Sequence, residues 1–476
     1  MEEKPISINA LDGYPAVDKE RLEESLKAER KGFDRKIIVL DDDPTGTQTV
    51  HDIPVVTDWK EDTLKEIFSM EEQMVFILTN SRSFSREHTK DVHKEIGEHI
   101  ASAARESGKD FLVISRGDST LRGHFPLETE VLRETLEKEC GIKFQGEIIC
   151  PFFKEGGRYT LNNIHYVKEG DSLTPAGQTE FARDKSFSYQ SSHLGEYVEE
   201  KSAGKYKKED CIYISLEELR GLKLDQITEK LLKAEDFCKI IVNAVDYEDV
   251  EAFCICWIRA MKQGKHFLAR SAAALTRVIG GVCEIPLLTK ASLVDRDTKN
   301  GGLVIVGSHV KKSSDQLASL MESRAELQFI EFNVNCYFTE GNLEGETERV
   351  KTMAEETLGK GGSVVVYTSR KLAVPPTEDK DKILALSVEI SKALTDVVRR
   401  LTLKPRFIVA KGGITSSDVA TRGLGIRKAM VMGQIKKGIP VWKTGPESKF
   451  PDMPYIIFPG NVGEVTTLRE IVEELM

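Results

Sequence analysis

Residues 111–123 read FLVISRGDSTLRG, an apolar run that passes directly into a polar loop with two glycines. An apolar run of this length, bounded by polar residues, predicts a buried strand. Apolar residues at positions 127, 131, 132 and 136 then follow with helical spacing. The arginines, aspartate and hydroxyls of the loop therefore lie between a strand and a helix, where open α/β sheets place ligands. A salt-bridged surface loop would have the same composition, so this loop needs support from elsewhere in the chain.

Three other expected strands, at 36–40, 74–78 and 146–150, also end in polar loops. Alternation of strands and helices predicts a mostly parallel sheet, in which the carboxyl ends of the strands share one edge. We therefore expect these loops to converge on one binding site. Arg82 and Arg116 would suit a carboxylate or a phosphate there, because a guanidinium binds either group bidentately.

The loop after the first of these strands begins with three adjacent carboxylates, Asp41, Asp42 and Asp43. Such an arrangement is costly unless a cation, a basic residue or a hydroxylated ligand lies beside it. A simple turn is the alternative interpretation, because Asp-Pro and Thr-Gly favour turns. Alternation along a strand would put Asp41 and Asp43 on one side and Asp42 on the other.

The chain has 476 residues, which predicts two or three domains, and its net charge of -10 gives no support to a nucleic-acid partner. It contains no apolar run near the roughly 20 residues that span a bilayer, and its first residues lack the order of a signal peptide. We expect a cytoplasmic protein whose eight cysteines, without a CxxC pair, are free thiols. His93 and His99 fall on a charged helix and are expected to be solvated.

Residues 284–301 are predicted to be a linker, after which the strand and helix pattern restarts. The expected domains are residues 1–290 and 302–476. In the second domain, a strand at 406–410 runs into KGGITSSD, a glycine loop that opens a helix and could present backbone N–H groups to phosphate. A second glycine turn, PGNVG at 459–463, follows the last strand. Neither a Walker A loop nor a GxGxxG fingerprint occurs, which disfavours an NAD-dependent oxidoreductase.

Together these motifs resemble those of the four-carbon acid sugar kinase family, which phosphorylates threonate, erythronate and 3-oxo-tetronate at the 4-hydroxyl with ATP. Residues 42–46 resemble the DDxTG motif of the family, and 118–123 match its DSTLRG. Residues 156–160 with 165–167 resemble its GRTT…HYV segment. The remaining matches are a serine motif at 270–272 and the ATP loops at 411–416 and 459–463.

The resemblance implies an α/β fold of two domains, each a mostly parallel sheet flanked by helices, with the active site in the cleft between them. The N-terminal domain would bind the acid sugar and the C-terminal domain would bind ATP with Mg²⁺. No nucleic-acid or membrane partner is expected, and the protein could form a homodimer.

The implied catalytic residues are Asp42, Asp43 and Asp118. The implied substrate-binding residues are Arg82, Arg116, Gly117, Asp118, Ser119 and Arg158. The implied ATP-binding residues are Ser271, Lys411, Gly412, Gly413, Ile414, Thr415, Gly460 and Asn461.

The chain departs from the family pattern at two positions. Much of the family has GGDT where this chain has Gly413-Ile414-Thr415, and a lysine often stands where this chain has Arg116. The missing carboxylate favours the alternative hypothesis of a non-catalytic protein that binds sugar acids or nucleotides without turnover.

Overall fold

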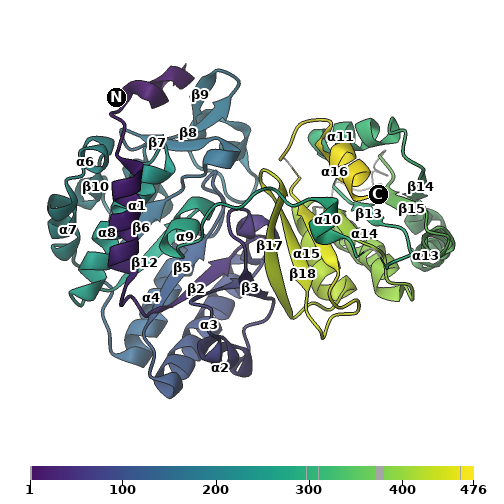
Figure 1. Ribbon diagram of the computed structural model, residues 1–476, viewed down its shortest axis with the longest axis horizontal. Coiled ribbons are helices and arrows are strands. Elements are labelled where there is room, and N and C mark those ends of the chain that lie inside the picture. Colours follow the sequence, from purple (N-terminus) through teal and green to yellow (C-terminus); the bar gives the residue numbers. More distant parts are fainter. Residues whose placement is uncertain (1–2, 296, 309, 371–379, 461) are drawn as a thin grey trace. The chain divides into compact units, whose positions relative to one another are not determined.

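The computed structural model describes residues 3–295, 297–308, 310–370, 380–460 and 462–476 (Figure 1). The chain forms two compact units. Unit 1 consists of residues 1–50 and 58–284, and unit 2 of residues 51–57 and 285–476. Both units are α/β, as the alternation of apolar runs and amphipathic segments predicts.

Unit 1 is built on a parallel sheet with the strand order β10-β11-β6-β12-β5-β2-β4. Helices cover both faces of this sheet, so its central strands are apolar along their whole length rather than alternating. The strands are β2 (Lys36–Asp41), β4 (Met74–Leu78), β5 (Phe111–Arg116), β6 (Gly146–Cys150), β10 (Ile212–Ile214), β11 (Cys238–Val242) and β12 (Phe267–Ser271).

The helices of unit 1 form two groups. Along the sheet, the chain crosses from β5 to β6 in one direction and from β11 to β12 in the opposite direction. Because crossovers are right-handed, connections that run in opposite directions place their helices on opposite faces of the sheet. One group contains α2 (Glu61–Ser69), α3 (Arg86–Ser107) and α4 (Leu127–Cys140). The other contains α1 (Lys19–Arg30), α6 (Leu216–Arg220), α7 (Leu224–Leu232), α8 (Tyr247–Lys262) and α9 (Ala273–Ile279).

A small antiparallel sheet, with the order β1-β9-β8-β7, is inserted after β6 and also takes in the N-terminal arm. Its strands are β1 (Ile6–Ser7), β7 (Arg158–Leu161), β8 (Ile164–Glu169) and β9 (Ser172–Pro175), and α5 (Leu194–Lys201) follows them. Aromatic residues of this insertion pack in a cluster that includes Leu121 and Phe125. The insertion therefore packs against the loop that follows β5.

The sheet of unit 2 has the order β3-β17-β18-β19-β16-β13-β15-β14. The pairs from β3 to β19 are antiparallel, and those from β19 to β14 are parallel. Its strands are β3 (Ile53–Val56), β13 (Leu303–Val306), β14 (Leu327–Phe332), β15 (Ser363–Thr368), β16 (Ile408–Lys411), β17 (Lys428–Lys436), β18 (Ile439–Thr444) and β19 (Pro454–Phe458). Its helices are α10 (Lys290–Leu293), α11 (Lys311–Met321), α12 (Cys336–Glu340), α13 (Glu344–Gly359), α14 (Lys380–Arg400), α15 (Gly413–Asp418) and α16 (Thr467–Leu475).

Two features of unit 2 differ from the expected division at residues 290 and 302. Strand β3 comes from the N-terminal part of the chain but hydrogen-bonds to β17 (Figure 1). The expected linker is not free either, since Leu288, Leu293 and Val294 pack into the hydrophobic core of unit 2. In both cases, apolar side chains pack against residues that lie far away in the sequence.

The parallel half of the unit 2 sheet contains a switch in strand order. The chain moves outward from β13 to β14 and later returns past β13 to β16, so helices α11 and α14 lie on opposite faces. Consistent with this, α11 packs on α16, whereas α14 packs on α13 and α15. The loops after β13 and β16 thus diverge from adjacent strand ends, which is where open α/β sheets bind ligands.

None of the helices in the described part of the chain is both long and apolar enough to cross a lipid bilayer.

Candidate functional site

The three aspartates at the end of β2 lie beside arginines but differ in their hydrogen bonds. Asp41 accepts a hydrogen bond from Arg116 over 3.3 Å, and Asp43 pairs with Arg82 and accepts the Thr45 N–H over 2.9 Å. Asp42 is 2% exposed, yet neither of its carboxylate oxygens has a hydrogen-bond partner among the described residues. Its nearest cations are Arg116 and Arg270, at 3.8 and 3.9 Å. Asp42 is therefore the carboxylate of the triplet whose oxygens are both left without a hydrogen bond within the described part of the chain.

Burial and the nearby arginines shift the pKa values of these three aspartates in different directions. Burial raises the pKa of Asp41 to about 7 against the opposing effect of Arg116, and burial also raises the pKa of Asp42 despite Arg82 and Arg270. For Asp43, burial is outweighed by Arg82 and the hydrogen bonds from Thr45, so its pKa lies below the usual range. The pKa values of Asp41 and Asp42 are thus shifted upward and that of Asp43 downward.

Asp118, in the loop after β5, is held in its charged form. It accepts from the Arg122 Nε over 2.7 Å and from the Thr120 hydroxyl, and the Arg82 Nη1 lies at 3.5 Å. Burial raises its pKa, but these partners outweigh burial and lower the pKa far below the usual range. Asp118 is therefore well placed to accept hydrogen bonds and poorly suited to take up a proton.

The inserted sheet and the segment that follows it fix the backbone of this loop through three hydrogen bonds. His165 Nε2 lies 2.7 Å from the Ser119 carbonyl oxygen, and the hydroxyls of Tyr189 and Tyr197 donate to the carbonyls of Thr120 and Leu121, each over 2.8 Å. Burial lowers the pKa of His165 to about 4, so this ring is neutral near pH 7.

Arg270 is a central residue that the sequence analysis did not include among the site residues. Its Nη1 donates to the Ser115 hydroxyl over 2.8 Å and to the Glu128 carboxylate over 2.5 Å. A Cβ at Gly117 or at Gly123 (φ 127°) would come within 2.2 or 2.5 Å of this guanidinium. The loop can wrap the guanidinium only because both positions are glycine. In the sequence, Arg270 directly follows the apolar run Phe267–Ala269, and this position indicates that it is buried.

Glu128 and His93 extend this buried network below the loop. Glu128 also accepts the Ser81 hydroxyl over 2.6 Å, and the His93 Nε2 lies 3.9 Å away. Burial raises the pKa of Glu128, but Arg270 and His93 outweigh it and bring the pKa to about 2. The expectation that His93 is solvated is wrong: its side chain is 1% exposed, because that face of α3 packs on α4.

Arg158, at the start of β7, differs from the other arginines of the site. It forms an ion pair with none of the carboxylates in the described residues, and its buried Nε has no hydrogen-bond partner there. Its Nη1 donates to the Gly156 carbonyl, and its guanidinium lies over the Phe181 ring at 5.5 Å. Arg122 lies over the same ring at 5.2 Å. By contrast, Arg82 and Arg116 are both paired with aspartates.

We predict that Asp41 makes the stability of the protein depend on pH. The folded pKa of about 7 exceeds the ordinary value of 3.8, so the folded state binds more protons than the unfolded state between these values. The free energy of unfolding should therefore contain a component that falls as pH rises from about 4 to about 7. Asp41→Asn should flatten this slope, measured by urea unfolding across the window. Equal slopes for the two proteins would contradict the assignment.

In unit 2, Lys411 lies at the end of β16 but does not project from the sheet edge. Its side chain is fully buried, its ammonium donates to the Pro459 and Gly460 carbonyls, and it lies 4.0 Å from the Phe458 ring centroid. Burial lowers its pKa to about 7. Lys411 therefore anchors the glycine turn after β19, and its ammonium is occupied by carbonyl oxygens.

The glycines at this edge allow the adjacent loops to approach each other closely. A Cβ at Gly307 would lie 2.4 Å from the Thr415 hydroxyl oxygen, and one at Gly412 (φ 119°) would lie 3.0 Å from the Ser308 Cβ. Helix α15 begins at Gly413, and Ile414 in its first turn is 64% exposed. Gly307, Ser308 and the 412–415 loop thus lie together at the strand-order switch.

Arg370, another residue absent from the sequence predictions, joins the ends of β13 and β15. It donates to the carbonyl oxygens of Ser308 over 2.7 Å, Val306 over 3.2 Å and Thr368 over 2.9 Å. It therefore stabilises the loop after β13 from the opposite side to α15.

Two predicted ATP-binding residues need separate mention. Asn461 lies outside the described residues. Ser271 ends β12 in unit 1, where it pairs with Arg116 across the sheet; its hydroxyl is buried and has no hydrogen-bond partner among the described residues. Ser271 thus belongs to the site at the end of β2 and β5 and lies in a different unit from the glycine loops.

No group of three or more His, Cys, Asp or Glu side chains within the described ranges is arranged to hold a metal ion.

Comparison with known families assigns a ligand class to each unit. Residues 37–279 match the family described as a sugar-binding N-terminal domain. The chain belongs to this family. Residues 303–468 match a nucleotide-binding C-terminal domain, so the two matches correspond to the sheets of unit 1 and unit 2. Ser271 falls within the sugar-binding match.

Solved structures share the fold at low sequence identity. The Haemophilus influenzae protein HI1011 is 18% identical with a TM-score of 0.60, over 92% of this chain and 100% of that one. A Salmonella typhimurium LT2 protein, named as a candidate tRNA synthase, is 15% identical with a TM-score of 0.63, over 92% and 98%. A Bordetella bronchiseptica protein, solved as a domain-swapped dimer with bound citrate, is 17% identical with a TM-score of 0.37, over 92% and 98%. A comparison with curated proteins found no match.

Proposed function

We propose that the protein is an ATP-dependent kinase that phosphorylates the terminal 4-hydroxyl of a four-carbon acid sugar such as threonate, erythronate or 3-oxo-tetronate. The observation that carries this proposal is the presence in one chain of a sugar-binding domain with a buried carboxylate–arginine site and a nucleotide-binding domain with glycine loops. Phosphoryl transfer needs mainly positioning and electrostatic stabilisation, together with a group that accepts the hydroxyl proton. Both units provide residues of the kind that these roles require.

In this proposal, Asp42 accepts the hydrogen bond and then the proton of the attacking hydroxyl. Its two carboxylate oxygens have no hydrogen-bond partner among the described residues, whereas those of Asp43 and Asp118 are engaged by arginines, hydroxyls or backbone N–H groups. The pKa of Asp42 is raised, whereas those of Asp43 and Asp118 are lowered, so Asp42 is the better proton acceptor of the three. Asp118 would instead hold another hydroxyl of the sugar through its charged oxygens.

Arg158 is proposed to bind the carboxylate of the acid. Arg82 and Arg116 were the candidates from sequence, but their guanidinium groups neutralise Asp43, Asp41 and Asp42. Arg158 lacks such a carboxylate partner among the described residues, and a half-buried guanidinium without one favours an anionic ligand.

The loops at the strand-order switch of unit 2 are proposed to bind ATP. A Cβ at Gly307 or Gly412 would crowd Thr415 or Ser308, so the glycines let these loops pack closely. A glycine loop that opens a helix can present backbone N–H groups to phosphate oxygens. Mg²⁺ would accompany the phosphates and neutralise their charge, usually keeping several waters and few protein ligands. The alternative of a non-catalytic binder rests on Ile414, whose exposed apolar side chain stands at this loop.

The experiment that tests this proposal is ADP release by the purified chain with Mg-ATP and a panel of the three acids. The kinase proposal predicts that at least one acid stimulates ADP formation well above the rate with ATP alone. Binding of an acid and of ATP without ADP formation would favour the non-catalytic alternative.

Replacing Arg158 with Gln should raise the KM for the acid and leave the affinity for ATP unchanged. Hydrogen bonds to charged groups contribute about 1.5–3 kcal/mol, which corresponds to an increase of roughly 10- to 100-fold. Arg133→Gln is a matched control, since Arg133 also lies over an aromatic ring, that of Phe237, but pairs with Glu137 on α4. Steady-state kinetics with varied acid distinguish the two variants, and an unchanged KM in the Arg158 variant would reject its role.

A further inference from the structure

The loop after β5 has a backbone conformation that depends on its neighbours. Leu121 has φ 69°, in the left-handed region that residues other than glycine rarely adopt, and Tyr197 donates to its carbonyl oxygen over 2.8 Å. Such a conformation persists where the surrounding structure maintains it. The same loop carries Asp118, the proposed partner of a sugar hydroxyl, so the groups that hold the loop also set the position of this carboxylate.

His165 is one of these groups, and its side chain is fully buried. Its Nε2 lies 2.7 Å from the Ser119 carbonyl oxygen, and its Nδ1 lies 3.0 Å from the Thr160 hydroxyl oxygen. A carbonyl oxygen can only accept a hydrogen bond, so Nε2 must carry a proton. Burial lowers the pKa of His165 to about 4, so the ring is neutral near pH 7 and Nδ1 keeps its lone pair. The Thr160 hydroxyl therefore donates to Nδ1.

Thr160 faces His165 across the β7–β8 hairpin, where the two residues are paired. It is also fully buried, and its backbone exchanges two hydrogen bonds with Ala244, over 2.9 and 3.1 Å. Its hydroxyl therefore reaches the imidazole from a fixed position. Donation to Nδ1 fixes the orientation of the ring and favours the tautomer with the proton on Nε2, which is the tautomer that bonds the Ser119 carbonyl.

We propose that Thr160 and His165 are positioning residues for the acid sugar, which hold Ser119, and with it Asp118, in the place that binds a sugar hydroxyl. Neither side chain needs to touch the ligand, because both act through the Ser119 carbonyl. This role rests on the proposed function for the identity of the ligand, whereas the tautomer and the order of the loop are properties of the chain without ligand.

Thr160→Val tests this role, because it removes the hydroxyl and keeps the size of the side chain. Threonate, erythronate and 3-oxo-tetronate are titrated in turn by calorimetry without ATP. The affinity for the acid that binds should fall by roughly 3- to 10-fold, in the range of one neutral hydrogen bond. Amide hydrogen exchange in residues 117–123 should become faster, and the affinity for ATP should not change. Thr160→Ser keeps the hydroxyl and should behave like the parent.

Replacing His165 with Leu removes both hydrogen bonds of the ring and leaves the Ser119 carbonyl without its donor. The affinity for the acid should then fall by about 10-fold or more. If this variant fails to fold, the comparison of Thr160→Val with Thr160→Ser still decides the outcome.

The ¹⁵N NMR signals of the histidine ring report the tautomer in the chain without ligand. In the parent, Nε2 of His165 should have the chemical shift of a protonated nitrogen and Nδ1 that of an unprotonated one. Thr160→Val should move the Nδ1 signal, because this nitrogen loses its donor. A proton on Nδ1 in the parent would contradict the assigned donors and overturn the proposal.

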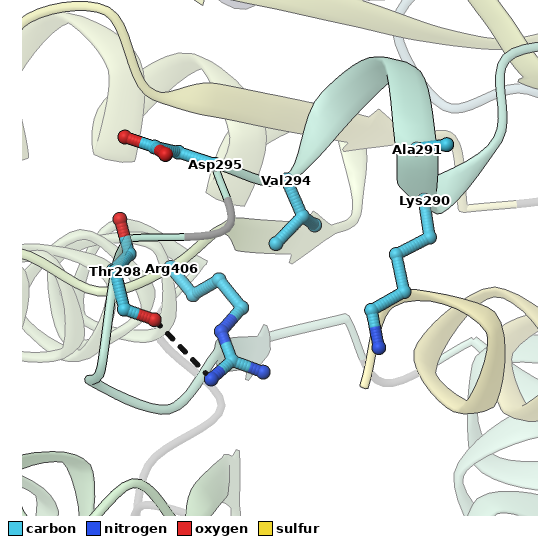
Figure 2. Close-up of a pocket in the computed structure, with 6 residues that line it drawn as sticks. All are labelled: Lys290, Ala291, Val294, Asp295, Thr298 and Arg406. Atoms are coloured by element: carbon cyan, nitrogen blue, oxygen red, sulfur yellow. Dashed lines mark hydrogen bonds between the residues drawn. The ribbon is translucent and has the colours of Figure 1, made fainter.

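Two control variants separate this role from a general loss of stability. Thr276 is also fully buried, but its hydroxyl donates to the Ala273 carbonyl within α9 over 2.7 Å. Arg406 in unit 2 donates to the Thr298 carbonyl in a pocket of about 480 Å³ (Figure 2). Thr276→Val and Arg406→Gln should leave the binding of the acid and the exchange of residues 117–123 unchanged.

Unchanged acid affinity and unchanged loop exchange in Thr160→Val and His165→Leu would overturn the proposal, and so would an equal loss of affinity in Thr276→Val. Binding of an acid without ADP formation would contradict the kinase proposal alone. If the parent binds none of the three acids, the proposed function fails, and the loop exchange and ¹⁵N signals still decide whether Thr160 and His165 hold the loop.

Discussion

Replacing Asp42 with Asn should lower kcat by about 10²-fold or more, the range that a general base contributes. Asn keeps the size of the side chain but cannot take up the hydroxyl proton. The fold should survive, because the Asp42 oxygens make no hydrogen bond to the described residues that the substitution would remove. Rapid-quench or steady-state measurement of ADP formation, together with thermal unfolding, checks both parts.

Asp41→Asn is the matched control for this prediction. Asp41 is adjacent and equally buried, but its carboxylate is paired with Arg116, so its loss should alter stability more than turnover. Equal and small rate effects for Asn at positions 41, 42 and 43 would mean that the triplet only shapes a turn. In that case the proposed catalytic role of Asp42 would be rejected.

Replacing Arg270 with Gln should destabilise the protein by about 3–5 kcal/mol, the typical cost of breaking a buried ion pair from one side. Glu128 would then remain buried without its cation, next to Asp42 and under the loop formed by Gly117 and Gly123. The measurement is the free energy of unfolding from urea denaturation. A value within about 1 kcal/mol of the parent would show that the pair is dispensable.

The double variant Arg270→Gln with Glu128→Gln isolates the pair from its surroundings. Because removing both charges leaves no unpaired ion, its destabilisation should be smaller than the sum of the two single effects. Strict additivity would indicate that the two side chains act independently, despite the 2.5 Å contact between them.

The sequence could predict the α/β class and the convergence of loops because both depend on local patterns. Apolar runs ending in DDDPTG and RGDSTLRG locate strand ends, and parallel pairing brings those ends to one edge. The family matches confirm the expected division into a sugar-binding N-terminal domain and a nucleotide-binding C-terminal domain. Neither match names the acid substrate, so the kinase activity stays a proposal.

Other features depend on contacts between distant residues and could not be read from local patterns. The pairing of β3 with β17 joins residues 53–56 to 428–431, and no periodicity in either segment indicates its partner. The burial of Lys411 was also hidden, since its carbonyl partners at 459 and 460 lie in another loop. For the same reason, the sequence suggested Arg82 and Arg116 as ligands of a carboxylate or phosphate but could not show that the fold pairs them with Asp43 and Asp41.

The most direct test of the central claim is ³¹P NMR of a reaction containing the purified chain, Mg-ATP and the acid that best stimulates ADP release. The account predicts one new phosphate monoester signal, coupled to the protons on carbon 4 of the acid, which grows as the ATP γ-phosphate signal declines. Decline of ATP with release of inorganic phosphate alone, or no change with any of the three acids, would contradict it.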